Sequence, residues 1–167
     1  MSVAIMMGSK SDLEIVRNAF DVLDEFGVPF TARIMSAHRT PHEAAEFAAN
    51  AESNGCKVII CAAGMAAHLG GVVAAHTILP VIGIPMASEP LKAVDSLLAT
   101  VQMPPGIPVA TVGINASLNA AILAVEMLSL ADAELAERLA AYKSGLCKKI
   151  EKANEELKEL KYEYKTN

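Results

Sequence analysis

Residues 31–41 read Thr-Ala-Arg-Ile-Met-Ser-Ala-His-Arg-Thr-Pro and contain a transition from strand to helix. We expect the whole fold to be built from such strand–helix units. The first five of these residues carry β-branched or apolar side chains at alternate positions, which is typical of a strand. Pro41 suits the first residue of a helix, and Thr40 before it is a residue type that caps helix N-termini. The stretch therefore predicts a strand that passes into a helix through a short loop, and this loop holds His38 and Arg39.

The same change from strand to helix recurs along the chain. A continuous apolar run that ends at Gly8 predicts a strand buried on both faces. The residues after it have helical spacing, and Gly27 suits the C-terminal cap of that helix. Such alternation predicts an α/β fold with a parallel, doubly wound sheet in three layers and flavodoxin-like strand order. The predicted strands are 3–7, 30–35, 58–62, 81–85 and 108–112, and the predicted helices are 12–26, 41–54, 66–76, 94–101 and a long helix from about residue 118.

Length and composition narrow the class of protein. A chain of 167 residues suffices for one domain with a substantial core. Since 53% of the residues are hydrophobic and tryptophan is absent, the core must use small aliphatic side chains, and the apolar surface left over favours a homo-oligomer. A net charge of −5 without a basic stripe argues against a nucleic-acid partner.

The cysteines and the lengths of the apolar runs indicate the cellular compartment of the protein. The three cysteines form neither a paired framework nor a metal-type spacing, and the N-terminus shows no signal segment. No apolar run is long enough to span a membrane. We therefore expect a cytoplasmic protein without a membrane partner.

The loop after the first predicted strand is a candidate phosphate site. Right-handed crossovers would bring the loops after all five strands to one edge of the sheet. Gly8 permits close approach, Ser9 and Ser11 supply hydroxyls, and the amides at the start of a helix suit an anion. Asp12 could accept hydrogen bonds from ribose hydroxyls. Simple helix capping by the two serines is the alternative, and the glycine spacing matches neither a dinucleotide-binding loop nor a Walker loop.

Two histidines stand in the next two loops. His38 can titrate near neutral pH, and Arg39 offers a planar fork for phosphate or carboxylate, so this pair suggests proton transfer on an anionic substrate. A loop that merely caps a helix is the alternative. His68 follows Gly64 and Ala66 in a stretch with little side-chain bulk, where backbone amides could approach a flat ligand. A packed, hydrogen-bonded histidine is the alternative there.

The segment from Ala133 onward differs in character from the rest of the chain. Apolar residues recur near helical spacing among lysines and glutamates, which predicts an amphipathic helix. We expect residues 1–130 to form the catalytic α/β domain and 131–167 a C-terminal helical extension. The apolar stripe could cover a neighbouring subunit, and a solvated helix on its own domain is the alternative. The stripe consists of Leu135, Leu139, Tyr142, Leu146, Ile150 and Leu157.

A set of motifs follows one order between residue 3 and about residue 128. They are Met-Gly-Ser-Lys-Ser-Asp at 7–12, Ser-Ala-His-Arg-Thr-Pro at 36–41, Ala-Ala-His-Leu at 66–69, Leu-Pro-Val-Ile-Gly-Ile-Pro at 79–85, and Asp-Ser-Leu-Leu at 95–98 with Val-Gln-Met-Pro at 101–104. With these motifs the chain resembles the N5-carboxyaminoimidazole ribonucleotide mutase family of purine biosynthesis, also described as the catalytic subunit of phosphoribosylaminoimidazole carboxylase. Several of the motifs are seldom seen elsewhere.

The resemblance implies an isomerisation in which a carboxylate leaves the exocyclic nitrogen of an aminoimidazole nucleotide and joins the ring carbon. It implies His38 as the proton-transfer residue, and Ser9, Asp12, Ser36 and Arg39 as nucleotide-binding residues. It also implies a homo-octamer and a reaction without metal, ATP or organic cofactor. We add neighbouring loop residues to the candidate substrate-binding set, namely Gly8, Ser11, Gly64, Ala66, His68 and Leu69.

The chain departs from the usual family pattern at several loop positions. Met65 stands where the family usually has glycine, and Gly70 where it has proline. Leu-Lys-Ala at 91–93 replaces Leu-Ser-Gly or Leu-Asp-Gly, and Gly-Ile-Asn at 113–115 replaces Ala-Ile-Gly. Two other functions stay open: direct carboxylation of aminoimidazole ribonucleotide with carbon dioxide, and a flavodoxin-like module that binds a nucleotide without chemistry.

Overall fold

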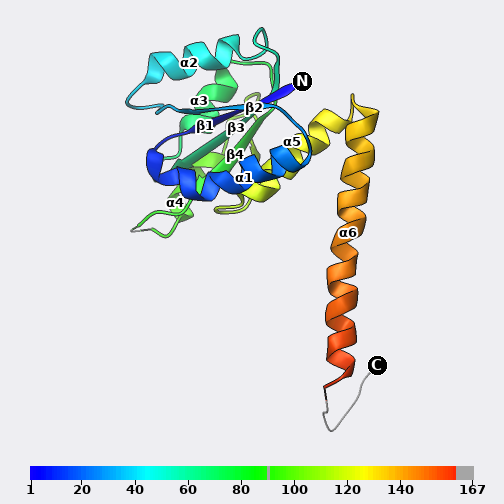
Figure 1. The fold of residues 1–167 in the computed structure, drawn as a ribbon. Helices are drawn as coiled ribbons and strands as arrows, with labels where there is room; N and C mark the ends of the chain where they lie inside the picture. Colours follow the sequence, from blue (N-terminus) through cyan, green and yellow to red (C-terminus); the bar gives the residue numbers. More distant parts are fainter. Residues whose placement is uncertain (90, 161–167) are drawn as a thin grey trace.

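Strands and helices alternate through most of the chain, as the sequence predicts (Figure 1). The computed structural model describes residues 1–89 and 91–160, apart from the side chain of Lys149. Residues 161–167 of the predicted extension and residue 90 of the predicted fourth loop lie outside the described residues. The elements are β1 (Ser2–Met7), the 3₁₀ turn η1 (Lys10–Asp12), α1 (Leu13–Glu25), β2 (Phe30–Ile34), α2 (Pro41–Asn50), β3 (Cys56–Gly64), α3 (Leu69–Ala75), β4 (Val81–Met86), α4 (Val94–Val101), β5 (Ala110–Thr111), α5 (Ser117–Ser129) and α6 (Ala133–Lys158).

The five strands form one parallel sheet in the order β2-β1-β3-β4-β5. This is the flavodoxin-like order predicted from the sequence. Met7 at the end of β1 pairs with Ile34 of β2 on one side and with Ala62 of β3 on the other. The loops that follow these three strands therefore start side by side, at the point where the strand order reverses.

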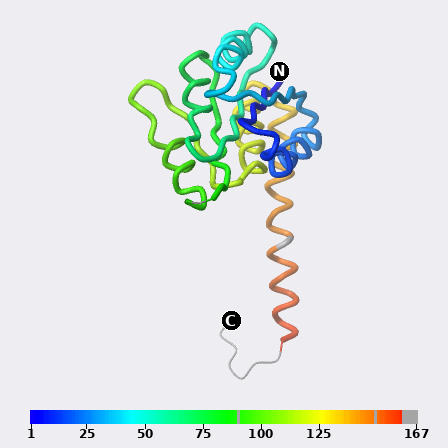
Figure 2. Tube along the Cα trace, turned by 90° about the vertical axis from the view of Figure 1, so that its left-hand side faces the viewer, coloured from blue at the N-terminus to red at the C-terminus, as the bar shows by residue number. Residues whose placement is uncertain are grey.

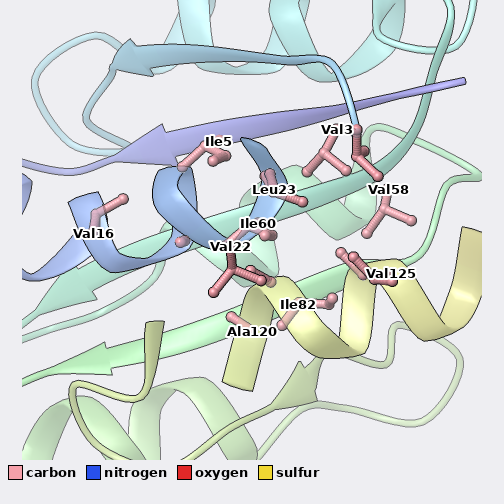
Figure 3. Close-up of a cluster of buried hydrophobic side chains, with 14 of the residues drawn as sticks. Val3, Ile5, Val16, Val22, Leu23, Val58, Ile60, Ile82, Ala120 and Val125 are labelled. Atoms are coloured by element: carbon pink, nitrogen blue, oxygen red, sulfur yellow. The ribbon is translucent and has the colours of Figure 1, made fainter. Parts of the chain in front are cut away.

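Helices cover both faces of the sheet, which confirms the predicted three layers. On one face α1 and α5 pack on alternate residues of the strands, and Figure 3 shows Val16 and Leu23 of α1 and Val125 of α5 around this cluster. On the other face α2 and α3 bury small side chains against the sheet. The α4 helix shares that second face, because a Cβ on Gly83 of β4 would meet Thr100 of α4.

The strand β5 and the helix α2 are shorter than predicted. β5 has two residues rather than the predicted 108–112, since it lies at the edge of the sheet and Pro108 has no N–H for the ladder. α2 ends at Asn50 rather than at Asn54. The hydroxyl of Ser53 donates to the Asn50 carbonyl at 2.8 Å, and such local side-chain bonds favour a turn over another helical residue.

The α3 helix begins at Leu69 rather than at Ala66. Met65 has a left-handed backbone with φ of 55°, and the amide of His68 donates to the Ala66 carbonyl at 2.7 Å. This tight bend keeps the preceding residues out of the helix, and they remain a loop at the carboxyl end of β3.

Gly27 ends α1 as the sequence predicts. Its φ of 64° is left-handed, which glycine adopts without the Cβ penalty. The Gly27 amide donates to Asp24 O, and the Val28 amide donates to Leu23 O. These bonds satisfy carbonyls of the last helical turn, so the chain can turn into β2.

The α6 helix begins on the domain and then leaves it (Figure 2). Leu135 and Leu139 are buried in the same core as α1 and α5, and Tyr142 packs its ring against Phe26 at 5.4 Å between centroids. Further along, Leu146 is 44% and Ile150 is 65% exposed. In the part of the chain that the structure describes, no helix has the length and apolar character needed to cross a membrane.

Candidate active site

A pocket of about 530 Å³ lies at the carboxyl edge of the sheet. Its walls come from the loops after β1, β2, β3 and β4. The structure brings all the sequence-predicted site residues together in it: Gly8, Ser9, Ser11, Asp12, Ser36, His38, Arg39, Gly64, Ala66, His68 and Leu69. A pocket at the strand-order reversal of such a sheet is the usual location of a ligand site.

The first loop both caps a helical turn and lines the pocket. The Ser9 hydroxyl accepts from the Ser11 amide at 3.3 Å, and the Asp12 carboxylate accepts from the Ser9 amide at 3.0 Å. The predicted alternative of simple capping is therefore present in the structure, on residues that also face the cavity. Burial raises the pKa of the Asp12 carboxyl, and hydrogen bonds from the Ser9 amide and the Ser11 hydroxyl oppose this rise.

The second loop is held by serine and threonine hydroxyls. Ser36 Oγ accepts from the amides of His38 at 3.3 Å and Arg39 at 3.2 Å. Thr40 was predicted to cap α2, but its side chain makes no capping bond. Its hydroxyl instead accepts from the Ser36 amide and donates to the Ser36 carbonyl, because the loop closes on itself at this point.

Arg39 joins the second loop to the first. Its Nη2 donates to the carbonyl oxygen of Gly8 at 3.0 Å, and the rest of the guanidinium keeps further donors. Within the described residues that line the pocket, Arg39 is the only arginine or lysine, and Asp12 is the only carboxylate. An anionic group in this pocket would thus pair with Arg39, beside the first and second loops.

His38 and His68 meet across the pocket. His38 Nε2 lies 2.9 Å from His68 Nδ1, and the ring centroids are 5.0 Å apart with planes inclined by 79°. At this distance one ring nitrogen donates and the other accepts, so the two imidazoles share a proton position. Each ring retains its other nitrogen for a ligand or solvent. The arrangement can hold and deliver one proton.

The third loop has a strained residue at its centre. Met65 is 60% exposed, and its left-handed φ of 55° is uncommon for a residue with a side chain. The Met65 amide donates to Ser88 Oγ at 3.2 Å. This left-handed backbone would suit a glycine, but the chain has Met65 there, and Met65 lines the pocket.

Sequence reasoning placed the loop after the fourth strand at this edge of the sheet but named none of Met86, Ala87 and Ser88 as site residues, and all three line the pocket. Met86 is the last residue of β4 and the other two follow it, and this position at a strand's carboxyl end was the only signal for them. Nor did it single out Asn115, whose Oδ1 accepts from the Ala87 amide at 2.8 Å. For a metal, no group of three or more His, Cys, Asp or Glu side chains comes together among the described residues.

The sheet order and the position of the pocket define a flavodoxin-like α/β protein whose pocket holds one arginine and a pair of histidines in contact. Residues 2–149 match the AIR carboxylase family, and the chain belongs to that family.

Relatives with two kinds of name support this assignment. An N5-carboxyaminoimidazole ribonucleotide mutase of Pyrococcus horikoshii is 49% identical over 161 residues, which is 96% of this chain and 91% of the relative. A phosphoribosylaminoimidazole carboxylase of Saccharomyces cerevisiae is 53% identical over 137 residues, which is 82% of this chain and 24% of the relative. The crystal structure of Treponema denticola PurE is similar with a TM-score of 0.85 and 30% identity, covering 93% of this chain and 98% of that one.

Proposed function

We propose that the protein is an N5-carboxyaminoimidazole ribonucleotide mutase, an isomerase of purine biosynthesis. The observation that carries this proposal is the contact between His38 and His68 in a pocket that also holds Arg39. The pocket thus combines a proton carrier with a binding site for an anionic nucleotide. Mutase relatives that match nearly the whole chain support the same activity.

The reaction needs one proton that is given and then taken back. His38 protonates the exocyclic nitrogen as the carbon–nitrogen bond of the carbamate breaks, and carbon dioxide and aminoimidazole ribonucleotide form. The ring carbon then attacks carbon dioxide with its π electrons, and the new carbon–carbon bond leaves a surplus ring proton. A histidine removes that proton, so atoms and charge balance without an oxidant or another reactant.

The nucleotide would be held on the opposite side of the pocket from the third loop. Ser9 and Ser11 offer hydroxyls at the start of a helical turn, and Arg39 offers a charged fork for phosphate. Asp12 and Ser36 would bind the ribose and the neighbouring polar atoms of the nucleotide. Asp12 is already held by the Ser9 amide within the first loop, and Arg39 by the Gly8 carbonyl between two loops, which lowers the cost of ordering them on binding.

Carbon dioxide must stay close to the ring between the two steps. Gly64, Ala66 and Leu69 line the pocket beside His68 and offer few polar atoms to hold water. Such a wall would exclude water and keep carbon dioxide near the carbon that it joins.

Assays with purified protein and two substrates test the proposal. We expect N5-carboxyaminoimidazole ribonucleotide to be converted to 4-carboxy-5-aminoimidazole ribonucleotide faster than aminoimidazole ribonucleotide is carboxylated at saturating carbon dioxide. Product formed only from the uncarboxylated nucleotide would instead make the protein a direct carboxylase. Binding of flavin mononucleotide or of the aminoimidazole nucleotide without any turnover would make it a binding module.

We further propose that the catalytic domain spans residues 1–130 and that 131–167 is an extension that packs on neighbouring subunits of a homo-oligomer, an octamer by family resemblance. Leu146, Ile150 and Leu157 are exposed on the part of α6 that leaves the domain. A second copy would bury this stripe.

Light scattering on the full chain and on residues 1–132 tests this assembly. We expect a large complex for the full chain and smaller or aggregating species for the truncated one. A monodisperse monomer in both cases would contradict the assembly proposal.

The cysteines support a cytoplasmic location for the reaction, which we also propose. Cys56 and Cys61 are buried free thiols and Cys147 is an exposed one. A reducing compartment would keep all three cysteines as free thiols. Fractionation of cells that express the tagged protein tests this location.

A further inference from the structure

Side chains that accept hydrogen bonds from backbone amides join three loops at the carboxyl edge of the sheet. Asn115, between β5 and α5, accepts from the Ala87 amide through Oδ1 at 2.8 Å. Ser88, between β4 and α4, accepts from the Met65 amide through Oγ at 3.2 Å. Because Ala87 and Ser88 are adjacent, the two bonds form one connection from Asn115 to the loop after β3.

Asn115 is itself fixed in place by its backbone. Its amide donates to Pro85 O at 2.9 Å, and its carbonyl accepts from the Ser117 amide at 2.9 Å. Its φ of 57° is left-handed, a conformation that asparagine tolerates better than most residues with a side chain. Where the usual family pattern has glycine, this chain therefore has a left-handed asparagine whose side chain adds a hydrogen-bond acceptor.

The connection ends at the wall that the proposed reaction needs most. Met65 lies between Gly64 and Ala66, and the same short loop carries His68, whose Nδ1 contacts His38. The bond from the Met65 amide to Ser88 thus ties this wall to the loop after β4. Asn115 does not line the pocket, so it can influence the chemistry only through these loops.

We propose that Asn115 is a positioning residue for carboxylate transfer, because through Ala87 and Ser88 it holds the wall that retains carbon dioxide. This inference rests on the proposed mutase function. In the first step the carbon–nitrogen bond breaks, nitrogen takes up a proton and carbon dioxide is freed. If carbon dioxide escapes before the carbon–carbon bond forms, the enzyme releases aminoimidazole ribonucleotide instead of the carboxylated product. A loosened wall therefore uncouples the two steps.

The test compares three variants by the ratio of aminoimidazole ribonucleotide to carboxylated product, with the substrate labelled in its carboxylate. Asn115→Gly removes the acceptor and keeps a residue suited to the left-handed backbone. Asn115→Asp keeps an oxygen that accepts from the Ala87 amide. Lys92→Gly is the matched control, since Lys92 is also left-handed, with φ of 49°, but is exposed and lines no part of the pocket.

We expect Asn115→Gly to raise the ratio about fivefold to tenfold, the effect of losing one positioning hydrogen bond, with the KM for the nucleotide nearly unchanged. Asn115→Asp should restore the parental ratio, and Lys92→Gly should leave it unchanged. Amide hydrogen exchange at Ala87 and Met65 should quicken in Asn115→Gly but not in Asn115→Asp or Lys92→Gly. Ser88→Ala, which breaks the next bond of the connection, should raise the ratio in the same way and serves if Asn115→Gly does not fold.

The other outcomes distinguish failure of this inference from failure of the proposed function. A parental ratio in both Asn115→Gly and Ser88→Ala would overturn the inference and leave the mutase function intact. An equal rise in Lys92→Gly would overturn it too, because loop strain rather than the acceptor would then be responsible. A parent protein that does not convert the N-carboxylated nucleotide would instead overturn the proposed function, and this inference with it.

Discussion

Gly83 is the position in the sheet where a single added methyl group should have the clearest effect. A Cβ there would lie 2.3 Å from Thr100 Cγ2 and 2.9 Å from Val109 Cγ1. Carbon atoms in contact prefer about 3.5–4.0 Å, so both neighbours would have to move. Thr100 is buried, and its hydroxyl donates to Ser96 O at 2.7 Å, which restricts its rotation.

Gly83→Ala should therefore destabilise the protein by overpacking. Such insertions into a well-packed core cost about 1–3 kcal/mol. In a chain of this length a loss of about 2 kcal/mol lowers the Tm by about 4–8 °C. Because Ser96 Oγ donates to Met86 O beside the pocket, displacement of α4 should also reduce turnover.

Thermal unfolding followed by circular dichroism measures this loss, at one protein concentration because assembly shifts the apparent Tm. The matched variant is Thr100→Ser, which removes the clashing Cγ2 and keeps the hydroxyl. In the double variant it should recover at least half of the loss caused by Gly83→Ala, and this non-additivity reports the contact. A Gly83→Ala protein that melts within about 1 °C of the parent, or additive effects in the double variant, would refute the packing argument.

Three further predictions concern the pocket. His38→Asn should lower turnover about 100-fold to 10,000-fold while calorimetry shows nucleotide binding retained, and turnover within a few-fold of the parent contradicts the proton-transfer role. Arg39→Ala should weaken binding of the nucleotide about tenfold or more and binding of the nucleoside without phosphate much less; equal losses move Arg39 away from the phosphate. For Asp12 the raised pKa means that the folded state holds the proton at pH values where the unfolded state has lost it. The unfolding free energy of the parent should therefore fall as pH rises through that window, and that of Asp12→Asn should not show this fall. A difference in unfolding free energy between the two proteins that does not change with pH would contradict the burial argument.

The sheet was predictable because its signals are local. Continuous apolar runs in β1, β3 and β4 indicate strands buried on both faces, and the structure places all three in the centre of the sheet. The lengths of β5 and α2 were not predictable, because the missing N–H at Pro108 and the hydrogen bond of the Ser53 hydroxyl decide them. Such effects depend on which neighbour lies beside the residue in space.

The candidate site was predictable as a set of loops but not as a geometry. Parallel strands with right-handed crossovers bring their carboxyl ends to one edge, so the residues after each strand had to be neighbours. Whether His38 would contact His68, or Arg39 would reach Gly8, depends on loop conformations that no periodicity encodes. The same holds for Asn115, which lies far from the pocket loops in the sequence.

Three departures from the family pattern, all at positions where the pattern has glycine, have a left-handed backbone in this chain. Met65, Ala93 and Asn115 stand where the usual pattern has glycine, and all three have left-handed φ values of 55°, 72° and 57°. A side chain in that conformation costs about 1 kcal/mol or more, so each must be offset by what the side chain does. Ala93 is fully buried, and Asn115 holds the Ala87 amide. Met65 has neither compensation, since its side chain is mostly exposed at the pocket wall. The free-energy cost of the left-handed Met65 is therefore offset by the Ser88 and Asn115 hydrogen bonds that hold the loop in place. These bonds are more necessary here than in a chain with glycine at position 65.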